Sequence, residues 1–584
     1  SSGHFWLKHV IRFGVSWLCK LSCVRLYTIH VMLVFTVALL AIAGHGHGRR
    51  QVTRKRIESV SPGEHQYRSQ WETEQLQAKG PLRALTLLSL SIGNPAAGWQ
   101  AAGHSLKLAG TPATRHRRSP APLLSGTADA RSLPLTGLRS LIVGGGPSGL
   151  LLAHRLLDGG ASVSILEGRP DPRTPGYLEG RAYALGLGLR GRTAIRTVDE
   201  ELWQAVADNG FPSDRFTLHF GKFKFDLRTP DDSNAEPSVL TYQSELCSAM
   251  LSELLRRHSS KNLTVTFESK VISCNPLSGI VKYITDGKEC TASADLIAGC
   301  DGVNSVVRAG LAEAAPAFQV TKKPLPGNLK VVRLDAMPPP LAPDAVSVVP
   351  GSPISAFLEP TPSGACALLT WRDGGAGSDP TELTDAKEAA ELLASSLPLI
   401  GTVFNRTEVG EQFVRQRPSS AATVLCNCYH VGRAVLLGDA AHSTGGATGQ
   451  GCNSALQDAA ALADLLLNEA TAASQVSEDT VSSALRKFSR QRVPEGRALL
   501  ELSTGPGRAS GPLRRAFFAL RTVANSFLYR FGLGQPPLQT ELTTSLTPFV
   551  DIRRKRDAEY GEPFPGAEEF EREMLLVEES ARAQ

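Results

Sequence analysis

The stretch "LRSLIVGGGPSGLLLAHRLLDGGASVSILEG" (residues 138–168) decides the fold. The apolar run at 140–143 predicts a strand, and three consecutive glycines follow it. An apolar helical pattern then extends from Pro147 to Asp158, and a second apolar run at 162–167 predicts another strand. A strand, a glycine turn, a helix and a strand in this order indicate an α/β, Rossmann-like unit.

The glycine turn predicts a phosphate-binding loop. Gly144, Gly146 and Gly149 have the GxGxxG spacing, in which the first glycine permits the tight turn and the second lets a pyrophosphate approach the backbone. The third lets helix and strand pack closely. Pro147 and Ser148 open the helix, where a missing N–H costs little and free amides face the phosphate.

Glu167 ends the second predicted strand, 23 residues after Gly144. An acid at that place can hydrogen-bond an adenosine ribose. The turn in this setting therefore predicts dinucleotide binding rather than a purely structural turn.

Two further segments carry an acid and a glycine after an apolar strand. The stretch "ADLIAGCDGVNSVVR" (294–308) predicts a buried strand ending in Asp301-Gly302. The stretch "GRAVLLGDAAHSTGGATGQGCNSALQDAAALADLL" (432–466) predicts a strand, then Gly438-Asp439, a glycine-rich loop and a helix from about Asn453.

The three segments together, in this order, resemble the FAD-dependent aromatic hydroxylases, the single-component flavoprotein monooxygenases, over residues 138–497. Residues 179–195 and 449–466 are similar to the plant and algal kynurenine 3-monooxygenase-like branch. The resemblance implies an α/β fold with a three-layer, GR2-type FAD-binding domain. It also implies an inserted mixed β-sheet substrate domain and a C-terminal helical extension.

The resemblance assigns roles within this sequence. The ADP half of FAD would lie on the first glycine turn and Glu167, and Arg181 would lie beside the flavin. Asp301 and Gly302 would support the pyrophosphate and the entry of NADPH. Asp439 would bind the ribityl or pyrophosphate portion. The remaining cofactor residues are Gly438 and, beside the flavin ring, Gly449, Gln450, Gly451 and Asn453.

The resemblance also implies the activity. NADPH or NADH would reduce FAD, O₂ would form a flavin 4a-hydroperoxide, and a small aromatic or hydrophobic substrate would be hydroxylated. His442 is a candidate for proton transfer, with packing and loop hydrogen bonds as the alternative. A reductase or epoxidase of an isoprenoid lipid, and a flavin-binding redox protein without turnover, remain alternative functions.

The sequence departs from the family pattern at several places. Gly445 and Gly446 stand where prolines are common, and Gln243 stands where an Arg is common. Arg215 lies near the position of a substrate-carboxylate clamp, but no Tyr between it and Tyr242 completes that clamp. Arg215 is therefore either a clamp residue or a surface salt-bridge residue.

The first 137 residues differ in composition from the rest. They contain 17 of the 62 Lys and Arg residues but only 5 of the 56 acidic residues, so the net charge of +6 belongs to this leader and nucleic-acid binding is not expected. Residues 26–44 form an apolar segment followed by basic residues, which predicts targeting to a plastid or another organelle. Cleavage of this segment, its retention as a membrane anchor, and translation starting only at Met32 remain open.

The later regions complete the predicted organisation. The FAD-binding monooxygenase domain is expected over 138–505, with short strands at about 320–425 covering the flavin as a substrate lid. There, Phe357 and Trp371 fit a core better than a substrate platform. Residues 506–584 form the extension. It contains a basic amphipathic helix at 512–534 that suits an anionic membrane surface or the enzyme's own body, then a charged, mobile tail at 551–573.

The ten cysteines show no CxxC or Cys/His ligand spacing, so neither a disulfide framework nor a metal site is expected. The sequence leaves the oligomeric state open.

Overall fold

A computed structural model describes residues 133–174, 177, 183–221, 223–228, 236–372, 379–446, 448–505, 529 and 535–584. The leader with its apolar segment 26–44, Arg181, and all of 512–534 except Tyr529 lie outside the described residues. No helix that the structure describes in these ranges is long and apolar enough to cross a membrane.

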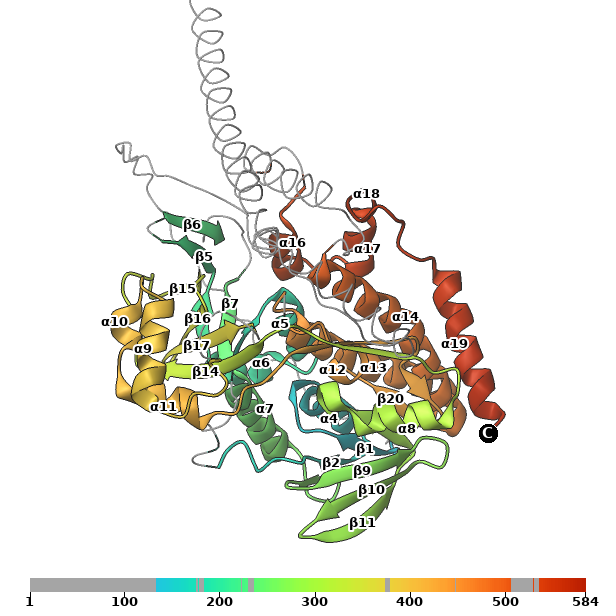
Figure 1. Ribbon diagram of the computed structural model, residues 1–584. Coiled ribbons are helices and arrows are strands. Elements are labelled where there is room, and N and C mark those ends of the chain that lie inside the picture. The colour runs from blue at the N-terminus through green and yellow to red at the C-terminus, as the bar shows by residue number, and fades with distance from the viewer. Residues whose placement is uncertain are drawn as a thin grey trace, which may run out of the picture. The chain divides into compact units, whose positions relative to one another are not determined.

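A six-stranded sheet forms the centre of the fold (Figure 1). Its strands lie in the order β19 (His430–Val431), β20 (Ala434–Leu436), β12 (Leu296–Gly299), β1 (Arg139–Val143), β2 (Ser162–Leu166) and β8 (Leu263–Thr266). All neighbours pair in parallel except β19, which is antiparallel to β20. Parallel strands are covered on both faces, which explains why β1, β12 and β20 are nearly continuous apolar runs.

The central sheet lies between two other layers, as the resemblance implied. Helices α4 (Pro147–Asp158), α13 (Gly451–Ala473) and α14 (Glu478–Thr504) pack together on one side. The antiparallel strands β9 (Lys270–Asn275), β10 (Ile280–Thr285) and β11 (Lys288–Ser293) lie on the other side (Figure 1). The predicted helix Pro147–Asp158 agrees with α4 at both ends, and the predicted three-layer α/β fold is confirmed.

A second six-stranded sheet, called here the substrate sheet, covers the region beside the central sheet. Its order is β14 (Asn328–Leu334), β17 (Gly364–Trp371), β16 (Ser355–Thr361), β15 (Ala345–Val349), β5 (Arg215–Phe220) and β6 (Phe223–Arg228). It is mixed, because β15 pairs in parallel with β5 and the other neighbours are antiparallel.

The prediction of strands over about 320–425 was wrong in part. Residues 386–415 form α9 (Ala386–Ser396), α10 (Gly401–Phe404) and α11 (Thr407–Arg415) on one face of the sheet, and β5 and β6 join the sheet from upstream. These helices bury apolar side chains against the sheet, and Trp371 packs against Phe413 with ring centroids 5.6 Å apart. Trp371 is therefore a core residue, as expected.

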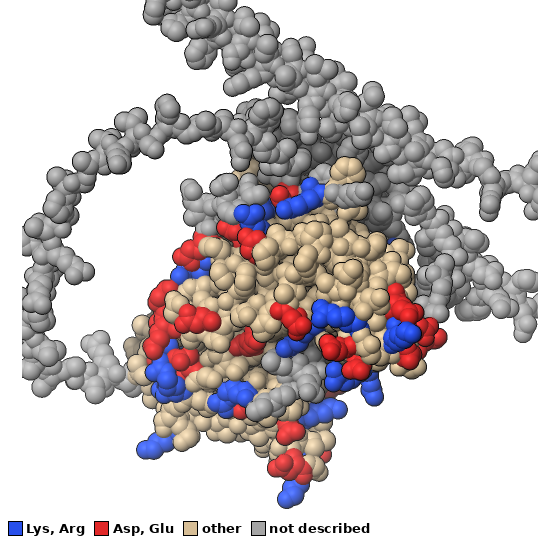
Figure 2. All heavy atoms as spheres, turned by 90° about the vertical axis from the view of Figure 1, so that its left-hand side faces the viewer, with Lys and Arg blue, Asp and Glu red and all other residues tan. Residues whose placement is uncertain are grey.

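Two smaller sheets link these parts. The strands β3 (Ala184–Leu187), β7 (Ser238–Tyr242) and β4 (Phe211–Ser213) form one, and β13 (Val320–Pro324) pairs with β18 (Ala422–Cys426) in the other. Helix α5 (Leu189–Arg196) follows β3, α6 (Glu200–Ala207) follows α5, and α7 (Gln243–Arg257) follows β7. The face seen in Figure 2 carries interspersed acidic and basic side chains, not one sign of charge.

The predicted mobile tail at 551–573 is wrong. The chain there forms α17 (Phe549–Arg554), α18 (Asp557–Tyr560) and α19 (Ala567–Arg582), preceded by α16 (Leu538–Thr544). Phe570, Met574 and Val577 are buried at i, i+4 and i+7 of α19, which packs on α14. Arg553, 1% exposed, pairs with Glu501 and Asp557 at 2.7 Å each. Several of the charges that suggested a mobile tail are paired with the protein body, including Lys555 and Arg556 with Glu541.

Candidate active site

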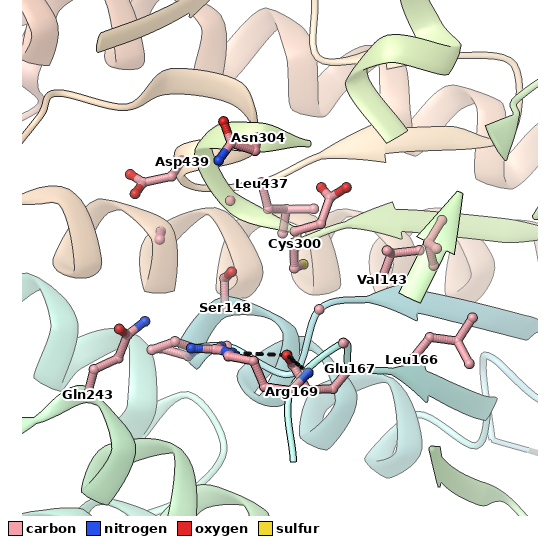
Figure 3. Close-up of a pocket in the computed structure, with 18 of the residues that line it drawn as sticks. Val143, Ser148, Leu166, Glu167, Arg169, Gln243, Cys300, Asn304, Leu437 and Asp439 are labelled. Atoms are coloured by element: carbon pink, nitrogen blue, oxygen red, sulfur yellow. Dashed lines mark hydrogen bonds and ion pairs between the residues drawn. The ribbon is translucent and has the colours of Figure 1, made fainter. Parts of the chain in front are cut away.

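One cavity of about 460 Å³ lies where the carboxyl ends of β1, β2 and β12 meet. Ligands in open α/β sheets bind at this edge. Nine of the predicted cofactor residues line the cavity: Gly144, Gly146, Pro147, Ser148, Glu167, Asp301, Gly302, Asp439 and Gly451. Figure 3 shows Glu167, Ser148, Cys300 and Asp439 arranged around it. The three sequence segments therefore form one site.

The glycine turn has a separate physical reason for each glycine. Gly144 has φ +104°, and a Cβ there would lie 2.4 Å from the Cys300 carbonyl oxygen. A Cβ on Gly149 would lie 2.2 Å from the Gly144 carbonyl oxygen, so this glycine lets α4 approach β1. A Cβ on Gly146 would meet no atom within 4 Å. Gly146 therefore leaves space for a ligand, at the N-terminus of a helix that has no side-chain cap.

Glu167 holds the glycine turn and Arg169 in place at the cavity wall by hydrogen bonds. Its Oε2 accepts a hydrogen bond from the Gly145 N–H at 2.7 Å, and its Oε1 accepts from the N–H and Nε of Arg169 at 2.9 and 3.0 Å. Arg169 places a cation at the cavity wall, and Lys270 of β9 places a second. These charges suit the diphosphate of a dinucleotide.

Asp301 presents an unused oxygen to the same site. Its Oδ2 accepts hydrogen bonds from the Val306 and Val307 N–H groups at 2.7 and 3.2 Å, while Oδ1 is buried without a partner among the described residues. Burial raises the pKa of Asp301, while the Ser305 side chain and the Val306 and Val307 N–H groups act in the opposite direction. An acceptor left unpaired in a binding cavity is suited to a ligand hydroxyl or N–H.

Asp439 and the start of α13 form the third side. Asp439 begins the short helix α12 (Asp439–His442), directly after Gly438 with φ +57°, and its side chain is exposed to the cavity. The surrounding protein withdraws its carboxyl from bulk water and raises its pKa, while His442 and Ser443 act in the opposite direction. Helix α13 has no side-chain cap, so its N-terminal amides face the space next to Gly451.

His442 faces away from this cavity. Its ring is 2% exposed, and its Nε2 lies 2.6 Å from Oδ2 of Asp458. The same oxygen accepts the Gly438 N–H at 2.9 Å, and Oδ1 of Asp458 accepts from Arg492 at 2.7 Å. Burial opposes the charge on Asp458, but His442 and Arg492 lower its pKa to about 2. His442 thus helps to hold the Gly438–Asp439 turn through Asp458, and these contacts favour the packing interpretation over proton transfer.

Asn453 also acts from behind the cavity. Its Oδ1 accepts the N–H groups of Gly188 and Gly191 at 2.9 and 3.2 Å, and its Nδ2 donates to the carbonyls of Gly186 and Gly449 at 2.9 and 3.2 Å. The amide is fully used by the protein and joins α13 to the segment after β3. The side chain of Asn453 therefore has a positioning role, and its contact with the flavin stays a prediction.

The other predicted residues divide into two groups. Gly449 has φ +66° with open space at its Cβ position, and Gln450 is 3% exposed, but neither lines the cavity. Arg215 pairs with Asp344 at 2.8 Å on the substrate sheet, with 41% of its side chain exposed. Between the two interpretations of Arg215, the structure supports the surface salt bridge.

Several cavity residues were missed by sequence reasoning. Arg169 follows Glu167 by two residues, a signal that was available. Tyr183 directly precedes β3 and lies within the segment 179–195 noted for its resemblance. Lys270 is the first residue of β9, and no motif indicates it. Gln243, noted as a departure from the family, does line the cavity, on the same side as Arg169 and opposite Asp439 (Figure 3).

The fold and the cavity define a flavoprotein with a Rossmann-like, three-layer domain. Residues 138–501 match the protein family described as FAD binding domain, more than half of the chain, and the chain belongs to that family. It is an FAD-dependent monooxygenase of the aromatic hydroxylase superfamily, with NADPH or NADH as co-substrate.

Individual relatives agree with this class. The kynurenine 3-monooxygenase of Anopheles gambiae is 27% identical over 379 residues, covering 62% of this chain and 72% of the relative. That of Stenotrophomonas maltophilia is 26% identical over 450 residues, covering 72% and 90%. The solved structure of a mutant 2-methyl-3-hydroxypyridine-5-carboxylic acid oxygenase has the same fold, with a TM-score of 0.51, 18% identity, and coverage of 70% and 96%.

The residues present fit FAD. Gly146 leaves room for a diphosphate at the α4 N-terminus, Glu167 stands where the ribose needs an acceptor, and Asp301 and Asp439 offer carboxylate oxygens along the cavity. The N-terminus of α13 supplies positive potential beside Asp439. FAD, when bound, supplies the redox chemistry with NADPH and O₂. The chain's own residues bind it, orient it and withdraw it from water.

Proposed function

We propose that the enzyme uses NADPH and O₂ to insert one oxygen atom into a small aromatic substrate held between the cavity and the substrate sheet. The observation that carries the proposal is the cavity itself, which joins the glycine turn, Asp301 and Asp439 in one space. The substrate sheet packs through β16 onto β7, next to the cavity residue Gln243. That packing provides a covered place for a substrate away from bulk water.

Absorption spectroscopy on the purified full-length protein tests the proposal in two steps. We expect a flavin band that bleaches when NADPH is added without oxygen. We then expect aromatic compounds to accelerate NADPH oxidation in air, and ¹⁸O from ¹⁸O₂ to appear in the product. Product without added oxygen would indicate a reductase, and a flavin band that NADPH never bleaches would contradict the function.

We further propose that the leader directs the enzyme to a plastid or another organelle. Residues 26–44, if retained, would anchor it to a membrane, and residues 512–534 would lie on an anionic membrane surface. The support is the apolar and basic composition of these segments alone. The location of a fluorescent protein fused to residues 1–137, observed by microscopy in cells, tests which organelle the leader targets. Sedimentation of the full-length protein with anionic vesicles, compared with neutral vesicles, tests the membrane association.

A further inference from the structure

Residues 538–549, called here the C-terminal strap, lie across the first turn of α5. The strap consists of α16, a short connection and the first residue of α17. Helix α16 packs on α5, and Leu542 and Phe549 of the strap are fully buried. The Thr543 carbonyl oxygen lies against Gly188, where a Cβ would stand only 3.1 Å from it. The strap therefore makes close contact with the segment that follows β3.

Arg190 of α5 joins the strap to the protein body. It is 2% exposed, and its Nε donates a hydrogen bond to the Leu542 carbonyl at 3.3 Å. Its Nη2 donates to the Thr547 carbonyl, and its guanidinium lies 4.1 Å from the centre of the Phe549 ring. Burial lowers the pKa of Arg190 to about 10, while Glu495 of α14 acts in the opposite direction. Arg190 is thus a buried cation at neutral pH, and the strap supplies the partners that compensate it.

The same turn of α5 holds the start of α13. The N–H groups of Gly188 and Gly191, on either side of Arg190, both donate to Oδ1 of Asn453 at 2.9 and 3.2 Å. Asn453 lies two residues after Gly451, which lines the cofactor cavity. A shift of this turn would therefore move the N-terminal amides of α13 relative to the cavity.

The strap also contacts the glycine-rich loop directly. Nε2 of Gln539 in α16 donates to the Thr448 carbonyl at 3.3 Å, one residue before Gly449. The far end of the strap is fixed by Glu495, which accepts the N–H groups of the first two residues of α17 at 2.8 and 3.2 Å. The strap is thus tied to the loop that leads into α13 and to α14 behind it.

We propose that Arg190 is a positioning residue, through which the C-terminal strap holds the N-terminus of α13 in the conformation that binds the flavin half of FAD. The ADP half fits on the glycine turn and Glu167, which are held by contacts of their own. The strap therefore acts on one half of the cofactor. The assignment goes beyond the proposed function, because it concerns how the cofactor is held and not which substrate is oxidised.

The test compares the affinities of the FAD-free full-length protein for FAD and for ADP, measured by isothermal titration calorimetry. We expect Arg190→Met to lower the affinity for FAD at least tenfold and to change the affinity for ADP less than twofold, because only FAD reaches the start of α13. Arg190→Lys should have an intermediate affinity for FAD, since its ammonium group can still donate to one carbonyl. Equal losses of both affinities, or an unchanged affinity for FAD, would overturn the proposal.

Arg192→Met, on the same helix, is the matched control. Arg192 is also 2% exposed, but its guanidinium pairs with Glu236 at 2.7 Å and not with the strap. The ratio of FAD affinity to ADP affinity should equal that of the wild type, even if the melting temperature falls. The same change of this ratio in Arg190→Met and Arg192→Met would contradict a specific role of Arg190.

A milder variant keeps the test decisive if Arg190→Met does not fold. Gln539 is exposed, so Gln539→Ala should leave the melting temperature unchanged while it removes the hydrogen bond to Thr448. We expect its affinity for FAD to fall about threefold, its affinity for ADP to stay the same, and the amides of residues 448–456 to exchange hydrogen faster in the FAD-free protein. Unchanged exchange and unchanged affinity for FAD would overturn the proposal.

The failure of this assignment differs from the failure of the proposed function. If the wild type binds FAD but oxygenates no aromatic compound, the proposed function falls, and the two affinities still decide the role of Arg190. If the wild type is an active hydroxylase but FAD and ADP affinities respond alike to Arg190→Met, only the role of Arg190 is overturned.

Discussion

In the glycine turn, some glycines are required for packing of the fold and another leaves space for the cofactor. A Cβ at Gly149 would collide with backbone, whereas a Cβ at Gly146 would enter open space. Gly145 is intermediate, because a Cβ there would lie at an ordinary 3.4 Å from the Glu167 side chain. A methyl group would therefore disturb the fold at Gly149, would enter the ligand space at Gly146, and would disturb neither at Gly145.

The substitution Gly146→Ala is expected to weaken FAD binding without weakening the fold. The methyl group would occupy the space of the diphosphate, so FAD affinity should fall at least tenfold, while the free energy of unfolding should change by less than about 0.5 kcal/mol. Fluorimetric FAD titration and urea unfolding measure the two quantities. Gly145→Ala is the matched control. Equal FAD affinity of Gly146→Ala and wild type would mean that the diphosphate lies elsewhere.

Glu359 of β16 is 8% exposed, and no hydrogen bond or ion pair joins it to another described residue. The pH dependence of stability tests this burial. Its folded pKa of about 7 lies above the ordinary value of 4.5, so the folded state binds more protons between these pH values. Stability should therefore fall as pH rises from about 4.5 through 7, by about 3 kcal/mol. Urea unfolding at pH 5 and pH 8 should show a smaller fall in Glu359→Gln than in the wild type. Parallel pH curves would show that Glu359 is not buried as a carboxyl.

At the scale of elements, Asp458 of α13 joins three helices around the Gly438 turn. It meets His442 of α12 at 2.6 Å and Arg492 of α14 at 2.7 Å, and all three side chains are buried. Removing one charge from such a cluster leaves the others without compensation.

The substitution Asp458→Asn is expected to lower the free energy of unfolding by about 3 to 5 kcal/mol and to reduce FAD content, because the Gly438 N–H loses a charged acceptor. Thermal unfolding and the flavin absorbance of the purified protein report both effects. Asp464→Asn, on the same helix with an exposed carboxylate paired to Arg155, is the control and should change stability by less than about 1 kcal/mol. A mild effect at Asp458 would mean that the cluster is not a buried ion pair.

Substitutions in helix α19 test whether the C-terminal residues pack on the protein body. Met574 is 2% exposed and Leu576 is 53% exposed on the same helix. We expect Met574→Ala to cost about 2 to 4 kcal/mol of unfolding free energy, and Leu576→Ala less than about 0.5 kcal/mol. Urea unfolding measures both. Equal free energies of unfolding of the Met574→Ala and Leu576→Ala variants would favour the mobile C-terminal tail that the sequence suggested.

At the scale of the whole molecule, the cavity is assembled from elements far apart in the chain. Residues near 144, 167, 270, 301, 439 and 451 all line it. A ligand that contacts all of them binds the folded state and not the unfolded chain, so its binding stabilises the whole domain.

FAD removal is therefore expected to lower the melting temperature. At an FAD concentration 100 times the dissociation constant, binding raises the free energy of unfolding by about 2.7 kcal/mol. For a chain of this size, this corresponds to a melting temperature several degrees higher. Differential scanning calorimetry of the FAD-free and FAD-loaded full-length protein, with AMP as a partial ligand, measures this difference. A melting temperature independent of added FAD would contradict the cavity assignment.

The sequence by itself determined the βαβ unit, the three acid-and-glycine segments and the cofactor class. Local rules suffice for these features, because the spacing of Gly144, Gly146 and Gly149 and the strand-end position of Glu167 follow from backbone geometry within about 30 residues. The boundaries of α4 followed from Pro147 and the apolar period for the same reason.

Only the tertiary structure decided which partners His442, Asn453 and Arg215 contact. It also decided that β5 and β6 enter the substrate sheet and that the C-terminal residues fold onto α14. A side chain's partner depends on pairing between distant segments, which no local pattern encodes. Asp458 contacts His442, which lies 16 residues away in the sequence, and Asn453 accepts a hydrogen bond from Gly188, which lies 265 residues away. Glu359 became visible as an unpartnered acid only when the strands around it were in register.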